Sequence, residues 1–378
     1  DITPSTSSGW SAAKARQVLG ALPEKLSVDC SGNIIKNVKG VVVPGSGGLK
    51  GIAVAAVLGA VGGDPGRGLD ALADVTEEHR KLTVELLRDK NFCRCGILAG
   101  DDTLDIAVTA KGGGHTALVK IRGEHTHIVE MERDGEPVCA ADAQIDEAQF
   151  GAADSADETA HLKEYLNVGD ILAFADVVNL ELVRKPLEAQ IEANSNIALE
   201  GLKNDYGVRV GKALLKKGCE GDLTVRARAL AAAGSDARMS GCPMPVVINS
   251  GSGNQGLTVS LPVLEYAKGL GASHDKLLRA LIVSNLISIH QKRFLGNLSA
   301  YCGATSAACG AVCGVAYLQG YGYEAIANTI TNAITTIGGM VCDGAKPSCA
   351  AKIAAALDSA FMAFDLQRDG GVFAPGEG

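Results

Sequence analysis

Three cysteines in the last quarter of the chain have the residue type and local setting of metal ligands. Cys342 and Cys349 bracket a short stretch whose glycine and proline force a turn. Ser348 is the predicted N-cap of an alanine-rich helix over about 349–364. The positive end of a helix favours the thiolate, which is the form of cysteine that binds metal. With Cys302 brought in from elsewhere, three thiols could hold three corners of an iron–sulfur cluster and leave the fourth iron open.

A second set of cysteines competes with this one. Cys309 and Cys313 follow Cys302 by seven and eleven residues, which places all three on nearly one stripe of a continuous helix. Gly303 argues against that continuity. Cysteine is also a small hydrophobe that is often buried for packing alone, and the C-x6-C spacing of Cys342 and Cys349 is not that of a zinc finger. Spacing alone therefore leaves either trio, or a packing role, open.

A polar, glycine-rich stretch from Asn249 to Gly256 is the second feature with chemical potential. It contains the pattern G-x-G-x-x-G, but a dinucleotide site needs a preceding strand and repeated βαβ units, which the surrounding sequence lacks. Pro262 also interrupts the segment that follows. We expect a polar loop that either binds a small polar ligand or caps a helix. The residues expected to contact such a ligand are Asn249, Ser250, Gly251, Ser252, Asn254 and Gln255.

A glycine-rich loop near residue 45 is a further ligand candidate. Ser46, Gly47 and Gly48 precede a buried helical run that begins at Ile52. Backbone N–H groups in such a loop can bind an anion such as a carboxylate. The loop does not match the phosphate-binding pattern G-x-x-x-x-G-K-[ST], and close packing alone would also explain its glycines.

Cys30 and three histidines complete the candidate set. Cys30 is predicted to lie in a polar turn, where a purely structural thiol is less natural than a reactive one. His125 and His127 are expected to share one face of a strand, as a metal or substrate pair or as an exposed polar face. His115 follows three glycines and could face the same cleft. No third histidine ligand is evident, so the exposed face is the simpler interpretation.

The elements that must position these residues are mostly helical. We predict a mainly α fold: a large helical domain of residues 1–91 and 156–378 around a central buried helix, with an α+β insert at 92–155. Alternating segments near residues 104–110, 116–121 and 125–131 predict a small antiparallel sheet within the insert. Residues 10–27 are predicted to form a surface helix, and residues 140–160 an acidic linker.

Composition limits the possible partners. Of the 378 residues, 47% are hydrophobic and 21% charged, so the chain is expected to bury a large core. The net charge of −8 and the absence of a long basic run argue against nucleic acid and anionic membranes. No apolar run reaches about 18 residues, so no membrane span is expected, and the first residues have no signal-peptide pattern.

The cysteine content indicates a reducing compartment. Eleven cysteines in a chain of this length do not resemble a small secreted disulfide scaffold, and the odd number leaves at least one thiol unpaired. We expect a cytoplasmic protein. The 47 glycines and the alanine-rich helices suggest small side chains at helix contacts, which makes a homodimer reasonable.

Taken together, the motifs around Cys30, Asn249–Gly256, Cys302 and Cys342–Cys349 resemble the L-cysteine desulfidase family. That family is related to the catalytic α domain of iron–sulfur-dependent bacterial L-serine dehydratases. The resemblance covers nearly the whole chain. It implies a [4Fe–4S] cluster held by Cys302, Cys342 and Cys349, and it implies no pyridoxal phosphate.

The resemblance also implies a reaction. One cluster iron would act as a Lewis acid in α,β-elimination from L-cysteine, giving sulfide, ammonia and pyruvate. Cys30 matches a cysteine of the desulfidase branch and is the expected base or sulfur-handling group. The loop at Asn249–Gly256 would bind the substrate amino and carboxylate groups, and Ser46–Gly48 is a second carboxylate candidate. L-serine dehydration and a non-enzymatic redox or oxygen sensor are the alternatives.

Overall fold

The chain divides into two compact units, which are described separately here. The computed structural model describes all residues except 1–2, 101, 140–159, 217–220, 297–298 and 378. Unit 1 comprises Asp1–Glu158 together with the short segment Asp343–Lys346. Unit 2 comprises Thr159–Cys342 and Pro347–Gly378. The predicted acidic linker at 140–160 lies almost wholly outside the described residues.

Unit 1 combines a small sheet with helices that cover one of its faces. Its elements are α1 (Thr3–Leu19), β1 (Lys25–Cys30), α2 (Gly32–Val38), α3 (Ile52–Gly62), the 3-10 helix η1 (Pro65–Asp70), α4 (Glu77–Leu86), β2 (Cys93–Ile97), β3 (Asp105–Gly112), β4 (His115–Arg122), β5 (Ile128–Arg133) and β6 (Glu136–Pro137). In the described part of the chain the sheet has the strand order β2-β1-β3-β4-β5-β6. The β1–β2 pair is parallel and the remaining pairs are antiparallel.

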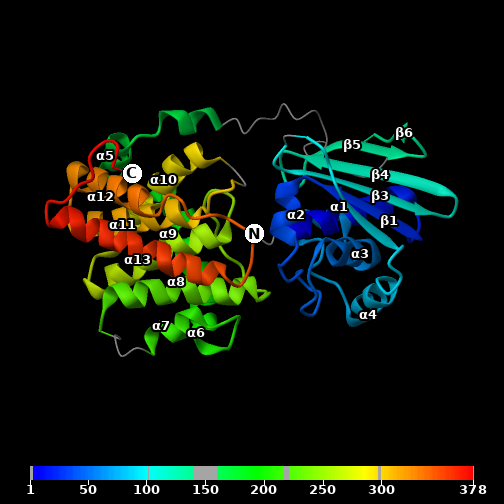
Figure 1. Ribbon diagram of the computed structural model, residues 1–378, viewed down its shortest axis with the longest axis horizontal. Helices are drawn as coiled ribbons and strands as arrows, with labels where there is room; N and C mark the ends of the chain where they lie inside the picture. The colour runs from blue at the N-terminus through cyan, green and yellow to red at the C-terminus, as the bar shows by residue number, and fades with distance from the viewer. Residues whose placement is uncertain (1–2, 101, 140–159, 217–220, 297–298, 378) are drawn as a thin grey trace. The chain divides into compact units, whose positions relative to one another are not determined.

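Alternating burial fixes the register of this sheet. In β4, Ala117, Val119 and Ile121 are fully buried and the residues between them are partly exposed. A strand with one apolar face buries that face against a helix layer. Here α1 packs against β3 and β4, and α3 packs against β1 and β2 (Figure 1).

Unit 2 is almost entirely helical. Its elements are the 3-10 helix η3 (Ala160–Tyr165), α5 (Val168–Val177), α6 (Glu181–Lys203), α7 (Val210–Leu215), α8 (Leu223–Met239), α9 (Gly253–Gly269), α10 (His274–Leu295), α11 (Ala304–Leu318), α12 (Tyr323–Ile337) and α13 (Cys349–Arg368). Helix α11 packs against α9, α10, α12 and α13 and is buried over nearly its whole length (Figure 1). The predicted mainly α fold, with a central buried helix and a small sheet, is confirmed.

The division into units differs from the predicted domains, which joined residues 1–91 to the helical domain. Strand β1 pairs with β2 and β3, and α1 covers β3 and β4. Residues 1–91 therefore pack with the sheet, and the sheet does not form an insert of 92–155 alone. The surface helix predicted at 10–27 is also wrong, because α1 is largely buried and Lys25–Cys30 is a strand.

Two local expectations in unit 2 also change. Helix α9 continues through Pro262 instead of stopping there, so the loss of one N–H donor at this proline does not end the helix. Ser348 precedes α13 as predicted, but its side chain makes no capping hydrogen bond.

Candidate functional site

The loops that carry Cys302 and Cys342 are joined by backbone hydrogen bonds. Tyr301 and Val341 form an isolated antiparallel bridge, and the Cys342 N–H donates to the Ala300 carbonyl at 2.7 Å. Cys302 lies two residues before α11, and Cys349 is the first residue of α13. The bridge therefore brings together cysteines that are far apart in the sequence.

The Cys302 thiol interacts with those of Cys342 and Cys349. A hydrogen bond with Cys342 and then burial raise the pKa of Cys302, and the negative charges of Cys342 and Cys349 raise it further. The N–H of Ala304, at the start of α11, donates to the Cys302 sulfur and opposes this rise. All three side chains are half-buried. The structure therefore places Cys342 and Cys349 near Cys302.

These residues fit an iron–sulfur cluster by donor chemistry. Soft thiolates are the ligands that such clusters require, and N–H groups directed at the sulfurs tune them. Among the residues described, no group of three or more His, Cys, Asp or Glu side chains has the geometry of a ready-made site for a metal ion. The fit therefore rests on the type and convergence of the three thiols and not on preset coordination geometry.

The competing trio is not assembled. Cys309 and Cys313 are fully buried inside α11 and hydrogen-bond to each other. That bond and a donor from Gln291, whose Nε2 lies 3.0 Å from the Cys309 sulfur, lower the pKa of Cys309 against the effect of burial. Cys302 interacts with Cys342 and Cys349 instead. Cys309 and Cys313 are core residues of the helix.

A buried amide faces the Cys302 loop. The Gln255 side chain is 7% exposed, and its Oε1 has no hydrogen-bond partner among the described residues. A Cβ on Gly303 would lie 2.4 Å from the Gln255 Cδ, so glycine beside Cys302 makes room for this amide. A buried polar atom without a partner is costly, which marks this point as a place for a polar ligand.

The stretch Asn249–Gly256 is a tight turn followed by a helix start, not one loop. Asn249 and Ser252 exchange two backbone hydrogen bonds. Ser250 and Gly251, the two central residues of the turn, have φ of 48° and 76°. A two-residue turn closed by this pair of hydrogen bonds requires such left-handed residues at its centre. Asn254 and Gln255 then lie in the first turn of α9, where N–H groups and the helix dipole attract anions.

The remaining glycines of the G-x-G-x-x-G pattern serve packing. A Cβ on Gly253 would lie 2.4 Å from the Arg238 Nε, and one on Gly256 would lie 1.9 Å from the Val247 carbonyl oxygen. The residues before the turn, 243–248, are not a strand. The dinucleotide interpretation is therefore excluded for this stretch by its local structure.

Asn249 is held by protein groups. Its Nδ2 donates to the Asn285 Oδ1 at 2.9 Å, and its Oδ1 accepts hydrogen bonds from Ser288 at 3.1 Å and Ser250 at 3.0 Å. Asn285 in turn exchanges hydrogen bonds with Gln190. Asn249 thus fixes the turn to α10, and the residues left to meet a ligand are those that follow it.

Two buried cations were missed at the sequence level. Arg238 in α8 is 4% exposed and its Nη1 lies 3.5 Å from the Asn254 Oδ1. Lys292 in α10 is 6% exposed. The available signal was a single arginine within the alanine-rich, wholly buried stretch 231–239.

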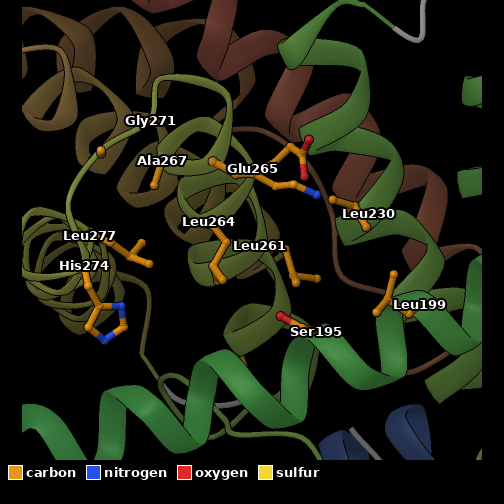
Figure 2. A pocket seen from close by; sticks show the side chains of 12 residues that line it. Ser195, Leu199, Leu230, Leu261, Leu264, Glu265, Ala267, Gly271, His274 and Leu277 are labelled. Carbon is orange, nitrogen blue, oxygen red and sulfur yellow. The ribbon is translucent and has the colours of Figure 1, made fainter.

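Two cavities of unit 2 differ in their relation to these residues. One of about 730 Å³ is lined by Ser250, by the cations Lys163, Lys292 and Arg293, and by one carboxylate, Glu164. The other, of about 560 Å³, lies among leucines of α6, α8, α9 and α10 (Figure 2) and contains none of the predicted site residues. The cationic cavity beside the Asn249 turn is the better match to an amino-acid carboxylate.

In unit 1, Cys30 is the last residue of β1 and is fully buried, not placed in a polar turn as predicted. Burial raises the pKa of Cys30, and the charges of Cys95, Asp29 and Asp105 add to the rise. The neutral thiol is therefore the favoured form.

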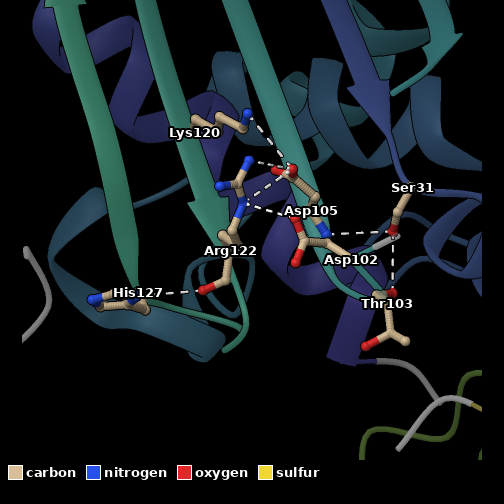
Figure 3. Close-up of polar contacts among 7 residues, drawn as sticks. All are labelled: Ser31, Asp102, Thr103, Asp105, Lys120, Arg122 and His127. Carbon is tan, nitrogen blue, oxygen red and sulfur yellow. Dashed lines mark hydrogen bonds and ion pairs between the residues drawn. The ribbon is translucent and has the colours of Figure 1, made fainter. Parts of the chain in front are cut away.

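A network of charged side chains lies beside Ser31, the residue that follows Cys30 (Figure 3). Asp105, 5% exposed, accepts from Arg122 Nη2 at 3.0 Å and lies 3.6 Å from Lys120 Nζ. The Ser31 hydroxyl donates to the Thr103 carbonyl at 3.1 Å and accepts from the Asp105 N–H at 3.3 Å. This network fixes the chain directly after Cys30.

The loop at residues 45–48 closes on itself. The Ser46 hydroxyl, 2% exposed, donates to the Leu49 carbonyl at 3.0 Å, and the Val43 N–H donates to the same oxygen at 2.9 Å. Gly47 and Gly48 have φ of 73° and 98°. Their role as a carboxylate site stays a prediction, since no described contact tests it.

The three histidines are separated. His125 and His127 lie in the turn before β5, so the prediction that they share a strand face is wrong. His125 Nδ1 is 2.9 Å from the Ser7 hydroxyl, and burial lowers the pKa of His125 to about 4. His127 Nδ1 is 3.3 Å from the Arg122 carbonyl (Figure 3), and His115 pairs with Asp134 at 2.7 Å. Each histidine has its own local partner.

Comparison with known proteins identifies one matching family and several relatives that cover nearly the whole chain. Residues 66–376 match the family described as "Serine dehydratase alpha chain". A relative named "UPF0597 protein" from Lachnoclostridium phytofermentans is 49% identical over 97% of this chain and 85% of its own length. Proteins of the same name from Treponema denticola and Desulfitobacterium hafniense are 43% and 45% identical, over 98% of this chain and 84% and 83% of theirs. No helix in the described residues is both long and apolar enough to cross a membrane.

Proposed function

The chain belongs to the serine dehydratase alpha chain family, and we propose that it is an iron–sulfur lyase degrading L-cysteine to sulfide, ammonia and pyruvate. One observation carries the proposal: the thiols of Cys302, Cys342 and Cys349 converge beside a buried Gln255 oxygen that has no partner among the described residues. Thiols alone would suit a storage or sensor site. The unsatisfied Gln255 amide oxygen next to the thiols favours a site that also binds a polar ligand.

Cys302, Cys342 and Cys349 would hold a [4Fe–4S] cluster. When bound with three protein ligands, such a cluster supplies a Lewis-acidic iron that polarises the substrate carboxylate and β-substituent. The Ala304 N–H, which already donates to the Cys302 sulfur, would hold that thiolate in place. Pyridoxal phosphate has no role in this proposal.

The substrate would lie at the start of α9. The amide of Gln255 and the N–H groups of the first turn are suited to a carboxylate, because the helix dipole is positive there. Ser250 and Lys292 line the adjoining cavity and would attract the same group. Asn249, which is already fully hydrogen-bonded, would position the turn and not bind the substrate itself.

Cys30 remains our proposed proton-transfer or sulfur-handling group. Its raised pKa favours the neutral thiol, which can donate a proton to a departing sulfur atom. To remove the substrate α-proton it would first have to lose its own proton. Ser46, Gly47 and Gly48 remain a proposed second carboxylate site.

L-Cysteine is the preferred substrate in this proposal because its soft sulfur matches iron in a thiolate environment. L-Serine is the alternative favoured by the family match itself. Both reactions end in pyruvate and ammonia. Cysteine consumes one water and releases sulfide, whereas for serine the water released in elimination balances the water used in hydrolysis.

The decisive test is a paired assay of anaerobically purified protein. We expect iron and labile sulfide in the protein, and equal amounts of sulfide and pyruvate released from L-cysteine. Pyruvate from L-serine at higher kcat/KM would replace the proposed substrate by the alternative. Cluster-loaded protein that turns over neither amino acid would support a sensor. Full activity after chelation and exposure to air would refute the cluster proposal.

A further inference from the structure

Arg238 is the most deeply buried cation near the three thiols. It is the second-last residue of α8 (Leu223–Met239) and is 4% exposed. Placing a guanidinium in a protein interior is strongly unfavourable unless negative or polar groups surround it. The packing of α8 shows which groups those are.

The register between α8 and α13 leads from Arg238 to Cys349. Arg228 donates to the Ala354 carbonyl at 3.2 Å and pairs with Asp358 at 2.6 Å, and Ala232 packs with Ala350 and Ala354. As the residue number rises along α8, it falls along α13, so the helices are antiparallel. They lie side by side (Figure 1), and the C-terminal end of α8 therefore reaches the N-terminal end of α13.

The other face of Arg238 lies against the first turn of α9. A Cβ on Gly253 would come within 2.4 Å of Nε and 2.8 Å of Cζ, so only glycine lets the guanidinium approach this closely. Nη1 also lies 3.5 Å from the Asn254 Oδ1. Arg238 is thus held between the turn expected to bind substrate and the helix that begins with Cys349.

The charges at this position are complementary. Burial lowers the pKa of Arg238 to about 10, while the negative charge of Cys349 opposes the fall. Arg238 is therefore still a cation at neutral pH. Three cysteine thiolates gathered at one point repel one another, and a cation in the same low-dielectric region offsets that repulsion.

We propose that Arg238 is a positioning residue that neutralises the Cys349 end of the ligand set and so controls how readily the protein takes up and keeps its cluster. This inference rests on the proposed function. It concerns assembly of the site rather than the reaction. Arg238 would act through Cys349 and would not need to touch the substrate.

The test compares Arg238→Met with Arg238→Lys and with Arg228→Met. Arg228 lies on the same helix and contacts the same partner helix, so its loss reports general weakening of the α8–α13 contact. Each protein is reconstituted anaerobically with iron and sulfide. Iron and labile sulfide per chain, the half-life of the cluster with a chelator, and the Tm of the cluster-free protein are measured.

We expect R238M to lose cluster at least about 10-fold faster than wild type, since removal of groups that support metal ligands costs about 10- to 100-fold in affinity. R238K should retain most of the cluster, because it keeps the charge. R228M should lower the Tm of the cluster-free protein without shortening the cluster half-life.

Three results would overturn the inference. R238K could fail as badly as R238M, which would show that charge is not the operative property. R228M could shorten the half-life as much as R238M, which would indicate plain destabilisation. R238M could keep a normal cluster and lose only substrate affinity, which would make Arg238 a substrate ligand. Failure of the wild-type protein to take up any cluster would instead refute the proposed function.

Discussion

The two units differ in whether their predicted site residues are already bonded to other protein groups. In unit 1, Ser46, His115, His125 and His127 each have a nearby protein partner. In unit 2, the thiols of Cys302, Cys342 and Cys349 share one region with the unsatisfied oxygen of Gln255. These residues of unit 1 therefore already use their polar groups within the protein, whereas Gln255 in unit 2 keeps a buried oxygen that a substrate would satisfy.

This difference shows that residue type alone is a poor guide to a binding site. Glycine-rich and polar stretches occur in both units. In unit 1 the loop at Ser46 uses its polar groups to close on its own backbone. In unit 2 the turn at Asn249 is fixed by α10, so that the next residues, Asn254 and Gln255, enter a helix start facing the Cys302 loop.

The strongest test of the comparison is Cys342→Ala. We expect cluster binding to weaken by more than about 100-fold, because even residues that only support a ligand contribute about 10- to 100-fold. Iron and labile sulfide per chain report the effect. Cys309→Ala, in the same unit, should keep the cluster and lose only about 1 kcal/mol of unfolding free energy. Loss of the cluster in C309A with retention in C342A would reverse the choice of ligands.

The Cys30→Ala variant tests whether a residue of unit 1 takes part in the reaction. If Cys30 transfers a proton, C30A should lose about 10²- to 10⁴-fold in kcat while iron and sulfide content stay at the wild-type level. Cys139→Ala is the control, because Cys139 is an exposed cysteine of unit 1. Unchanged kcat in C30A would remove Cys30 from the mechanism and leave unit 1 with a structural role.

A smaller effect should follow from Gly303→Ala. The added Cβ would lie 2.4 Å from the Gln255 Cδ and displace that amide. Overpacking of this kind costs about 1–3 kcal/mol, and we expect roughly a 10-fold loss in kcat/KM with the cluster retained. The control is Gly322→Ala, where an added Cβ has no neighbour within 4 Å and φ is −93°. Equal kinetics for both variants would show that Gln255 does not contact the substrate.

The smallest predicted effect belongs to unit 1 and concerns stability alone. Burial lowers the pKa of His125 to about 4, below the unfolded value of about 6.5. The stability that neutral, buried His125 contributes is therefore fully present above about pH 6.5 and is lost as the pH falls through about 4. Between about pH 7.5 and pH 5 the loss should be on the order of 1–2 kcal/mol.

Urea unfolding of cluster-free protein at both pH values would measure this loss. His125→Gln should make the free energy of unfolding depend less on pH. A slope in H125Q equal to that of wild type would assign the pH dependence to other groups.

Much of the architecture could be predicted from sequence periodicity. The long helices of unit 2 and the strands β3, β4 and β5 follow the expected patterns. Strand β1 was missed, although Lys25–Cys30 alternates in burial as a strand should. Its partners are β2, far along the chain, and β3. The partners of this short strand are far away in the sequence. Its local sequence alone therefore resembles the end of the preceding helix.

The site was predictable in part, for a related reason. The cysteines, the Asn249 turn and the local helix starts are visible in the sequence. Arg238 and Lys292 are not, because burial of a cation depends on which helices pack against it. The glycines of the G-x-G-x-x-G pattern illustrate the same limit: Gly253 and Gly256 are required by Arg238 and by the Val247 carbonyl, which are contacts that no spacing rule contains.

The bridge between Tyr301 and Val341 has a consequence for the timing of biosynthesis. Cys302 leaves the ribosome before Cys342 and Cys349, and neither of these two proposed ligands is near it until α12 has been made and the bridge has closed. A cluster delivered during translation would find a single ligand. If these cysteines hold the cluster, its insertion must follow synthesis of Cys349 at the start of α13, and the three thiols must stay reduced in the interval.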